Sequence, residues 1–450
     1  MSYDNIMGFR PVWEIEMDMA REHPAGDLDD ACNLASTALE AKAVGNLLVD
    51  PRFHSDPAAY HALLRRLRAE APVFWVEPDD YAPFWIVTRH ADVMQVERTM
   101  DIFVNGPRVM LRKTVVDDQI RKVTGGRPFL LNQLPNMDGD EHRLHRKLTQ
   151  AWFAPGRIKI LDEELRGYAR DLFDRTLDGD GRCDFMRAVA SWYPLRVIMR
   201  IIGVPAEDEA LMLKMTQQLF GPDDPEIKTE KIDVISTVQG FFDYFRALLE
   251  SRRTAPADDL ATLLAQAEIG EKEALSYFIL AATAGHDTTS ASIAGGTLAL
   301  LQNPDQFDRL RGDMSLLPSA VDEMIRWVSP VTHFFRTPTE DYELRGQTIG
   351  AGQAMMMCYP SANRDEEVFD EPYRFDIGRP PHRHLAFGYG PHVCLGQHLA
   401  RMEMRIFFEE LFARIDRLEL DGDPRWIQTN FVGGLKSLPV RYSSRAAIAA

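Results

Sequence analysis

The sequence is poor in cysteine and has no Gly/Ser-rich linker, internal repeat or low-complexity tract. Scattered cysteines exclude a disulfide framework and favour a reducing, cytoplasmic location. They are Cys32, Cys183, Cys358 and Cys394. The first 30 residues have no apolar run typical of a signal peptide or membrane anchor, so we expect a soluble protein. Without a linker, residues 1–450 are predicted to form one domain, with residues 1–50 as an irregular lead-in that contains one possible helix.

Positive charge is also in short supply, since the formal net charge is −17 at pH 7. This charge argues against binding to nucleic acid or to an anionic membrane surface. No flavin or iron–sulfur motif is recognisable, so a redox reaction of this chain would need electrons from another protein.

Helical periodicity dominates, and only a few short runs of aromatic and β-branched residues indicate strands. Val73–Val76 and Phe84–Val87 flank a proline-bounded turn and are predicted to form a hairpin. The sequence therefore predicts a mainly α-helical fold with small β-sheets. Residues 101–137 have weak helical patterns and are long for a loop in a compact domain, which favours a segment that covers a binding site.

Cys394 lies in the stretch FGYGPHVCLGQHLARMEMR, between a glycine-containing loop and a helical pattern. Near a helix N-terminus, the helix dipole and unpaired N–H groups favour a thiolate. A cysteine thiolate can be the axial ligand of haem iron, where it favours O–O cleavage. The alternatives are a buried structural cysteine and a zinc site. The histidines near enough for a zinc site are His382, His384, His392 and His398.

The stretch from Leu275 to Leu301 is almost free of charge and long enough to cross a membrane. Asp287 and Thr288 in its middle would be costly in lipid, so a long helix through a protein core is favoured. A threonine hydroxyl can bond back to a carbonyl group and distort such a helix. The alternative is that Gly285 ends one helix and Asp287 caps a second.

Two pairs of polar residues lie about one helical turn apart and share a helix face: His142 with Arg146, and Glu323 with Arg326. Pairs of this kind are usually solvated or form simple ion pairs. By themselves they do not assign a function.

Together these stretches resemble the cytochrome P450 family. The residues that match its haem-binding loop are Phe387, Gly388, Gly390, His392, Cys394 and Gly396. Those that match its central helix are Ala284, Gly285, Asp287 and Thr288. The resemblance begins at about residue 50, and it implies a large helical lobe and a smaller β-containing lobe with haem b between them.

The resemblance also implies roles for individual residues. Cys394 would ligate the iron, Asp287 and Thr288 would relay protons to dioxygen, and the small residues Ala284 and Gly285 would make room for it. The implied haem contacts are the loop residues Phe387, Gly388 and Gly396 and the propionate partners His142, Arg146, Arg336 and His392. A structural triad would consist of Glu323, Arg326 and Arg374, with Arg379 as a rival third member.

Within the family, the stretches ATAGHDTTS, VCLGQHLARMEM and NFVGG look especially similar to those of soluble bacterial members that hydroxylate α-terpineol. This implies a monooxygenase that uses O2 to hydroxylate a monoterpenoid or an alkyl-substituted ring. The pocket walls expected by matched position are Leu280, Thr283, Ala284, Val331, Thr332, Phe334, Phe431 and Val432. The alternatives are a larger lipid substrate such as a steroid or fatty acid, a non-catalytic haem sensor or carrier, and a peroxide-driven enzyme.

Electrons are expected from a small [2Fe-2S] ferredoxin with its reductase. Arg401 and Arg405 lie four apart on the helix after Cys394, and Lys147 is expected on the same side. The three residues predict a local positive patch that steers an acidic ferredoxin toward the haem.

Overall fold

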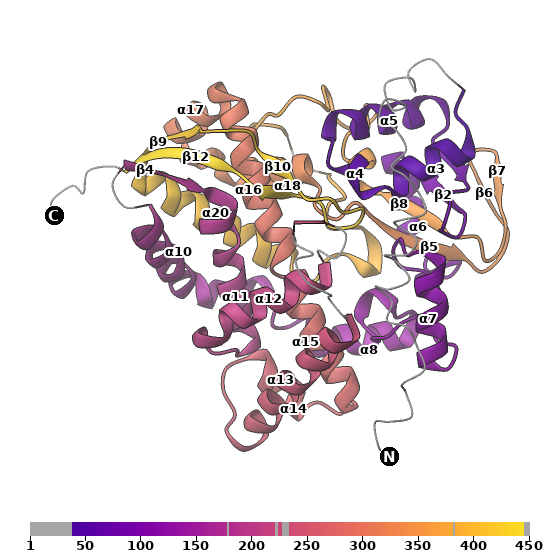
Figure 1. The fold of residues 1–450 in the computed structure, drawn as a ribbon, viewed down its shortest axis with the longest axis horizontal. Coiled ribbons are helices and arrows are strands. Elements are labelled where there is room, and N and C mark those ends of the chain that lie inside the picture. Colours follow the sequence, from indigo (N-terminus) through magenta and orange to yellow (C-terminus); the bar gives the residue numbers. More distant parts are fainter. Residues whose placement is uncertain (1–37, 178–179, 221–223, 227–233, 381–382, 445–450) are drawn as a thin grey trace.

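The structure is a computed structural model that describes residues 38–177, 180–220, 224–226, 234–380 and 383–444. Figure 1 shows helices throughout, with short strands gathered in a few places. The prediction of a mainly α-helical fold with small β-sheets is confirmed. Within the described ranges, no helix is both long enough and apolar enough to span a bilayer.

The helices differ widely in length, and most of the long ones follow residue 138. In chain order the helices before α11 are α3 (Ala41–Val49), α4 (Pro51–His54), α5 (Pro57–Glu70), α6 (His90–Arg98), α7 (Thr114–Thr124), α8 (Gly139–Thr149), α9 (Pro155–Ile158) and α10 (Asp162–Thr176). The later ones are α11 (Trp192–Ile202), α12 (Glu209–Phe220), α13 (Val234–Thr254), α14 (Leu260–Gln266), α15 (Glu271–Ala284), α16 (Asp287–Gln302), α17 (Pro304–Gly312), α18 (Leu317–Val328), α19 (Tyr359–Ala362) and α20 (Gln397–Arg414).

The largest sheet has five strands in the order β1-β2-β8-β5-β3. Its strands are β1 (Val73–Val76), β2 (Phe84–Val87), β3 (Phe103–Val104), β5 (His333–Pro338) and β8 (Met355–Cys358). The predicted hairpin is confirmed, since β1 and β2 pair antiparallel. Figure 1 shows this sheet among helices α3 to α6, to one side of the large helical region.

Three smaller sheets complete the strands. β4 (Asp180–Asp184), β12 (Pro439–Ser444) and β9 (Ile415–Leu420) form one sheet in that order, β6 (Tyr342–Leu344) pairs with β7 (Gln347–Ile349), and β10 (Arg425–Trp426) pairs with β11 (Leu435–Ser437). The chain thus returns near its end to pair with a strand from its middle, because β12 lies between β4 and β9.

The charge-poor stretch predicted to cross the core consists of two consecutive helices, α15 and α16. Side chains of α16 are buried without interruption from Thr289 to Leu300. α16 packs against α11, α18 and α20, and in Figure 1 it lies near the middle of the molecule. After Asp287 the helix has no charged residue, and a helix without a charged face is expected in such a buried position.

The segment 101–137 is more ordered than its pattern predicted. It contains β3, the eleven-residue helix α7 and a short 3₁₀ turn at Leu134–Asn136. Similarly, the last part of the predicted irregular lead-in forms α3, while residues 1–37, including Cys32, lie outside the described residues.

The structural triad has a different third member from the one predicted. Glu323 and Arg326 are fully buried and form two hydrogen bonds of 2.7 Å, as expected. Arg379 completes the group, with its Nε 3.2 Å from Glu323 Oε2. Arg374 instead pairs with Glu371 at the surface, where 58% of its side chain is exposed, so the assignment of Arg374 was wrong.

Candidate functional site

A cavity lies where α15 and α16 meet, between α8, β5 and the loop before α20. It contains about 1530 Å³ of empty space, part of it open to solvent. Its lining combines apolar walls with a few converging polar side chains, which is typical of a site for a cofactor or small molecule.

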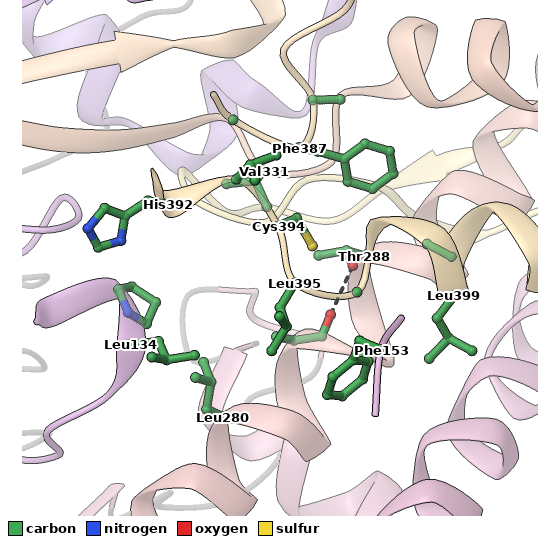
Figure 2. Close-up of a pocket in the computed structure, with 18 of the residues that line it drawn as sticks. Leu134, Phe153, Leu280, Thr288, Val331, Phe387, His392, Cys394, Leu395 and Leu399 are labelled. Atoms are coloured by element: carbon green, nitrogen blue, oxygen red, sulfur yellow. Dashed lines mark hydrogen bonds between the residues drawn. The ribbon is translucent and has the colours of Figure 1, made fainter. Parts of the chain in front are cut away.

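The loop that carries Cys394 is tightly folded. Gly388 and Gly390 have positive φ angles of 68° and 69°, and a Cβ atom at Gly390 would lie 2.4 Å from the carbonyl oxygen of Glu97. The N–H of Cys394 donates to the carbonyl of Phe387 at 2.8 Å. The loop therefore requires glycine at position 390, and it presents Cys394 to the cavity just before α20 begins (Figure 2).

Opposing effects act on the pKa of the Cys394 thiol. Burial raises the pKa of the thiol above its ordinary value. Backbone N–H groups of Gly396 and Gln397 and the guanidinium of Arg146 act in the opposite direction but do not reverse the shift. A metal cation at the sulfur would supply the missing stabilisation, because a coordinating thiol is deprotonated by the metal it binds.

Four polar side chains form a cradle at one part of this cavity: His142, Arg146, Arg336 and His392. The rings of His142 and His392 are stacked with centroids 3.8 Å apart, and Arg146 Nη2 donates to the carbonyl oxygen of Val393 at 2.7 Å. Burial lowers the pKa of His142 to about 4 and that of His392 to about 2, so both imidazoles are neutral at pH 7.

The cradle fits a cofactor that carries carboxylates. His142 Nε2 and Arg336 Nε are buried and make no hydrogen bond to a described residue. Unpaired buried polar groups are costly. Arg336 Nε can only donate, and His142 Nε2 donates in one of its two tautomers, so both atoms are suited to an acceptor that occupies the cavity. The two guanidinium groups add the positive charge that bound carboxylates need. A haem, which has two propionates and an iron for Cys394, matches this set of donors.

A break separates α15 from α16 at Gly285 and His286. A Cβ atom at Gly285 would lie 2.7 Å from Cγ1 of Ile198 on α11, so the close approach of α11 requires glycine here. α16 begins at Asp287, so the chain forms two helices here as the alternative predicted, but His286 and not Asp287 is the N-cap residue. The hydroxyl of Thr288 donates to the carbonyl oxygen of Ala284 at 3.0 Å and bridges the break, as drawn in Figure 2.

Asp287 and Thr288 have different surroundings. Thr288 lines the cavity together with Ala284 and Gly285, whereas Asp287 is not part of the lining. One carboxylate oxygen of Asp287, Oδ1, lies 3.1 Å from Nδ1 of the buried His286. The other, Oδ2, is buried and has no hydrogen-bond partner among the described residues.

The remaining wall of the cavity is mostly apolar. Of the eight predicted wall residues, four line it: Leu280, Ala284, Val331 and Phe334. The other four do not. Thr283 bonds back to Ile279 within α15, Thr332 donates to the carbonyls of Asn430 and Phe431, Phe431 packs on Phe334 at 5.6 Å, and Val432 forms a β-bridge to Val331.

Several lining residues were not predicted. Figure 2 labels Leu134, Phe153 and Leu399 among the sticks around the cavity. Leu134 and Asn105 belong to the segment 101–137, which was expected to cover a binding site. Glu403 on α20 also lines the cavity, and burial raises the pKa of this carboxyl well above its ordinary value. In the sequence, the only sign of Leu134 and Asn105 was that they lie in a long segment without clear periodicity. No sequence feature pointed to Glu403.

The predicted basic patch after Cys394 is largely neutralised. Arg401 Nε lies 2.7 Å from Asp322 Oδ1, and Arg405 Nη2 lies 3.1 Å from Asp162 Oδ2. Lys147 is exposed. The two arginines are therefore ion-paired, which offsets much of the local positive charge that was expected on this face.

The zinc alternative finds no support in the described part of the chain, where no group of three or more His, Cys, Asp or Glu side chains could hold a metal ion. His384 contacts Asp322 at 3.3 Å, and His398 is exposed on α20. His382 lies outside the described residues.

The same fold and site occur in known proteins. The sequence model of the cytochrome P450 family matches residues 196–442 of this chain. The chain is 42% identical over 420 residues to cytochrome P450-terp of Pseudomonas sp, covering 89% of this chain and 97% of that one. It is 36% identical over 390 residues to linalool 8-monooxygenase of Pseudomonas putida, covering 84% and 95%. The crystal structure of CYP108D1 from Novosphingobium aromaticivorans superposes with a TM-score of 0.83 at 44% identity, covering 90% and 99%.

The fold is mainly helical, and one cavity is lined both by the loop cysteine and by the two helices that meet at Gly285. These features are typical of a haem-thiolate protein. The chain belongs to the cytochrome P450 family. Members of this family use haem with a cysteine thiolate as the axial ligand, and the protein is accordingly a monooxygenase.

Proposed function

We propose that this monooxygenase hydroxylates a small hydrophobic molecule, either a monoterpenoid or an alkyl-substituted ring. The observation that carries the proposal is that Cys394, Thr288 and a mostly apolar wall share one cavity. The names of two relatives, cytochrome P450-terp and linalool 8-monooxygenase, support the terpenoid class.

In this proposal Cys394 holds the haem iron, and the cradle of His142, Arg146, Arg336 and His392 holds the propionates. The unpaired nitrogens of His142 and Arg336 support these roles, since each needs an acceptor. Phe387, Gly388 and Gly396 line the cavity beside Cys394 and would face the bound group. When bound, haem supplies the activation of O2 by two electrons, and the protein supplies the ligand, the protons and the orientation of the substrate.

Thr288 and Asp287 are proposed to deliver the protons that the reaction with O2 consumes. The hydroxyl proton of Thr288 is directed to Ala284, which leaves the Oγ1 lone pairs able to accept a hydrogen bond from a donor in the cavity. Asp287 is adjacent in sequence, and its unpaired Oδ2 can take up or release a proton. A haem sensor or carrier needs no such arrangement.

The wall residues are proposed to select the substrate. Leu280, Ala284, Val331 and Phe334 offer no charge and no side-chain hydrogen bond, whereas the two arginines of the lining lie in the cradle. A charged or strongly polar metabolite would lose its hydration at this wall without compensation. An apolar ring would gain from burial of its surface.

Electrons are proposed to come from a small [2Fe-2S] ferredoxin with its reductase, in the cytoplasm. The absence of a flavin or iron–sulfur motif from the sequence supports an external donor. The scattered cysteines support the compartment.

Spectral titration of the haem protein tests the substrate class. Monocyclic monoterpenoids, linalool and alkylbenzenes are expected to produce the Soret shift that marks loss of the iron-bound water, followed by hydroxylated product when O2 and a ferredoxin system are supplied. Phe334→Ala is expected to weaken this binding more than the matched change Phe431→Ala, because only Phe334 lines the cavity. A shift with steroids or fatty acids, but none with the small rings, would refute the proposed class.

A further inference from the structure

Glu97, in the last turn of α6, is a fully buried carboxylate next to the cradle. Its Oε1 accepts two hydrogen bonds, one from Arg336 Nη2 at 2.9 Å and one from the hydroxyl of Tyr359 at 2.6 Å. Arg336 and Tyr359 both line the cavity. Glu97 therefore lies directly behind two cavity side chains without itself being part of the lining.

Glu97 also contacts the loop that carries Cys394. Its carboxylate lies beside Gly388, where an added Cβ atom would be 3.7 Å from Oε2, and its main chain is the group that excludes a Cβ atom from Gly390. One residue thus connects α6, β5, α19 and the cysteine loop. Substitution at this position would act on the cradle and on the loop together.

The charges around Arg336 do not balance once the cavity is filled. Arg336 is 3% exposed, and besides Glu97 it donates from Nη1 to the carbonyl of Phe335 at 2.8 Å. Glu97 already neutralises this guanidinium. Two propionates in the cradle would therefore face Arg146 as the only guanidinium there without a carboxylate partner of its own among the described residues.

The contact with Arg336 favours the negatively charged form of Glu97. Burial raises the pKa of this carboxyl, whereas Arg336, the Tyr359 hydroxyl and the Tyr389 N–H oppose the shift. If Glu97 were neutral, the buried charge of Arg336 would be left without a partner, which is strongly unfavourable. The ion pair is the state that leaves neither group uncompensated.

We propose that Glu97 is a positioning residue that fixes Arg336 for the haem propionate and, through its negative charge, lowers the reduction potential of the haem. The inference rests on the proposed binding of a propionate by Arg336. A buried negative charge opposes the addition of an electron to a nearby cofactor, and this effect is strong where the local dielectric is low. Charge around a haem is one of the means by which a protein sets its potential.

The test is the midpoint potential of the haem protein, measured by spectroelectrochemistry at pH 7 for the wild type, Glu97→Gln and Asp365→Asn. Asp365 is the matched control, since it is 1% exposed, pairs with Arg89 at 2.6 Å and does not line the cavity. Glu97→Gln is expected to favour the reduced haem about tenfold, a rise of about 59 mV for one electron. Asp365→Asn is expected to lose stability without changing the potential.

An unchanged potential in Glu97→Gln, or an equal rise in Asp365→Asn, would overturn the proposal. Glu97→Met, which has a similar volume and no charge, repeats the measurement if the glutamine variant does not retain haem. Loss of haem from both variants would assign Glu97 a structural role only and would also overturn the proposal. The carbon monoxide spectrum separates this result from the proposed function, because a long-wavelength Soret band shows that thiolate ligation persists whatever the potential.

Discussion

Thr288 and Thr297 make the same local bond in two different surroundings. Each hydroxyl donates to the carbonyl four residues earlier, Thr288 to Ala284 at 3.0 Å and Thr297 to Ile293 at 2.8 Å. Thr297 is 1% exposed in the core, whereas Thr288 lines the cavity. The same substitution at the two positions therefore separates a role in the helix from a role in the chemistry.

Thr288→Ala is expected to bind haem and substrate and to consume reductant, but to release peroxide in place of hydroxylated product. Positioned proton transfer typically contributes about 10²–10⁴-fold, so the loss of product per reductant should be large. Thr297→Ala removes the same type of bond, about 1 kcal/mol of stability, and should leave that ratio unchanged. The measurement is product formed per reductant consumed, and equal ratios in both variants would leave Thr288 with a structural role only.

Cys394→Ala is expected to abolish the long-wavelength Soret band of the reduced carbon monoxide complex, because a thiolate ligand is the source of that band. Cys183→Ala is the control, since this half-buried thiol lies on β4 away from the cavity. The difference spectrum of each purified protein gives the answer. Survival of the band in Cys394→Ala would show that another residue holds the iron.

Arg379→Ala should destabilise the protein by about 3–5 kcal/mol, because it removes one partner of the buried Glu323 network. Arg374→Ala should leave the free energy of unfolding almost unchanged, since its pair with Glu371 is exposed. Denaturant unfolding followed by circular dichroism compares the two variants. A larger loss in Arg374→Ala would restore the assignment that the structure overturns.

Stability should decrease as the pH falls from about 6.5 toward 4, in part because of His54. Burial lowers the pKa of His54 from 6.5 to about 4, while its bond to the carbonyl of Leu48 opposes the shift. In this window the unfolded chain binds a proton that the folded chain does not, so unfolding is favoured as pH falls. His54→Gln, which keeps a donor for Leu48 but cannot titrate, should show a shallower decline of Tm between pH 7 and 4.5; an identical decline would contradict the role of His54.

The cysteine loop and the start of α16 could be predicted because each is contiguous in sequence. The glycines around Cys394 and the small residues before Thr288 express local requirements, a positive φ angle and a close helix contact, that the chain itself displays. Glu97 and Asn105 could not be predicted in this way. Glu97 meets Arg336 across 239 residues, and Asn105 meets His392 across 287, so only the folded chain brings them together.

The errors have similar physical causes. Arg374 and Arg379 lie on the same loop, and only its path after α19 decides which guanidinium reaches Glu323. The basic pair after Cys394 was correctly placed on one helix, but the acidic partners Asp322 and Asp162 come from distant elements. Sequence spacing predicts which residues share a helix face, but it does not predict the charges that this face will meet.

The separation of the cradle residues along the chain has a consequence for biosynthesis. Arg146 donates to the carbonyl of Val393, 247 residues later, and Cys394, the proposed iron ligand, follows one residue beyond. During synthesis on the ribosome, α8, α15 and α16 would therefore be complete well before the loop that carries Cys394 has been made. Haem insertion must wait until almost the whole polypeptide has been made, and the apolar cavity walls must remain protected from aggregation during that interval.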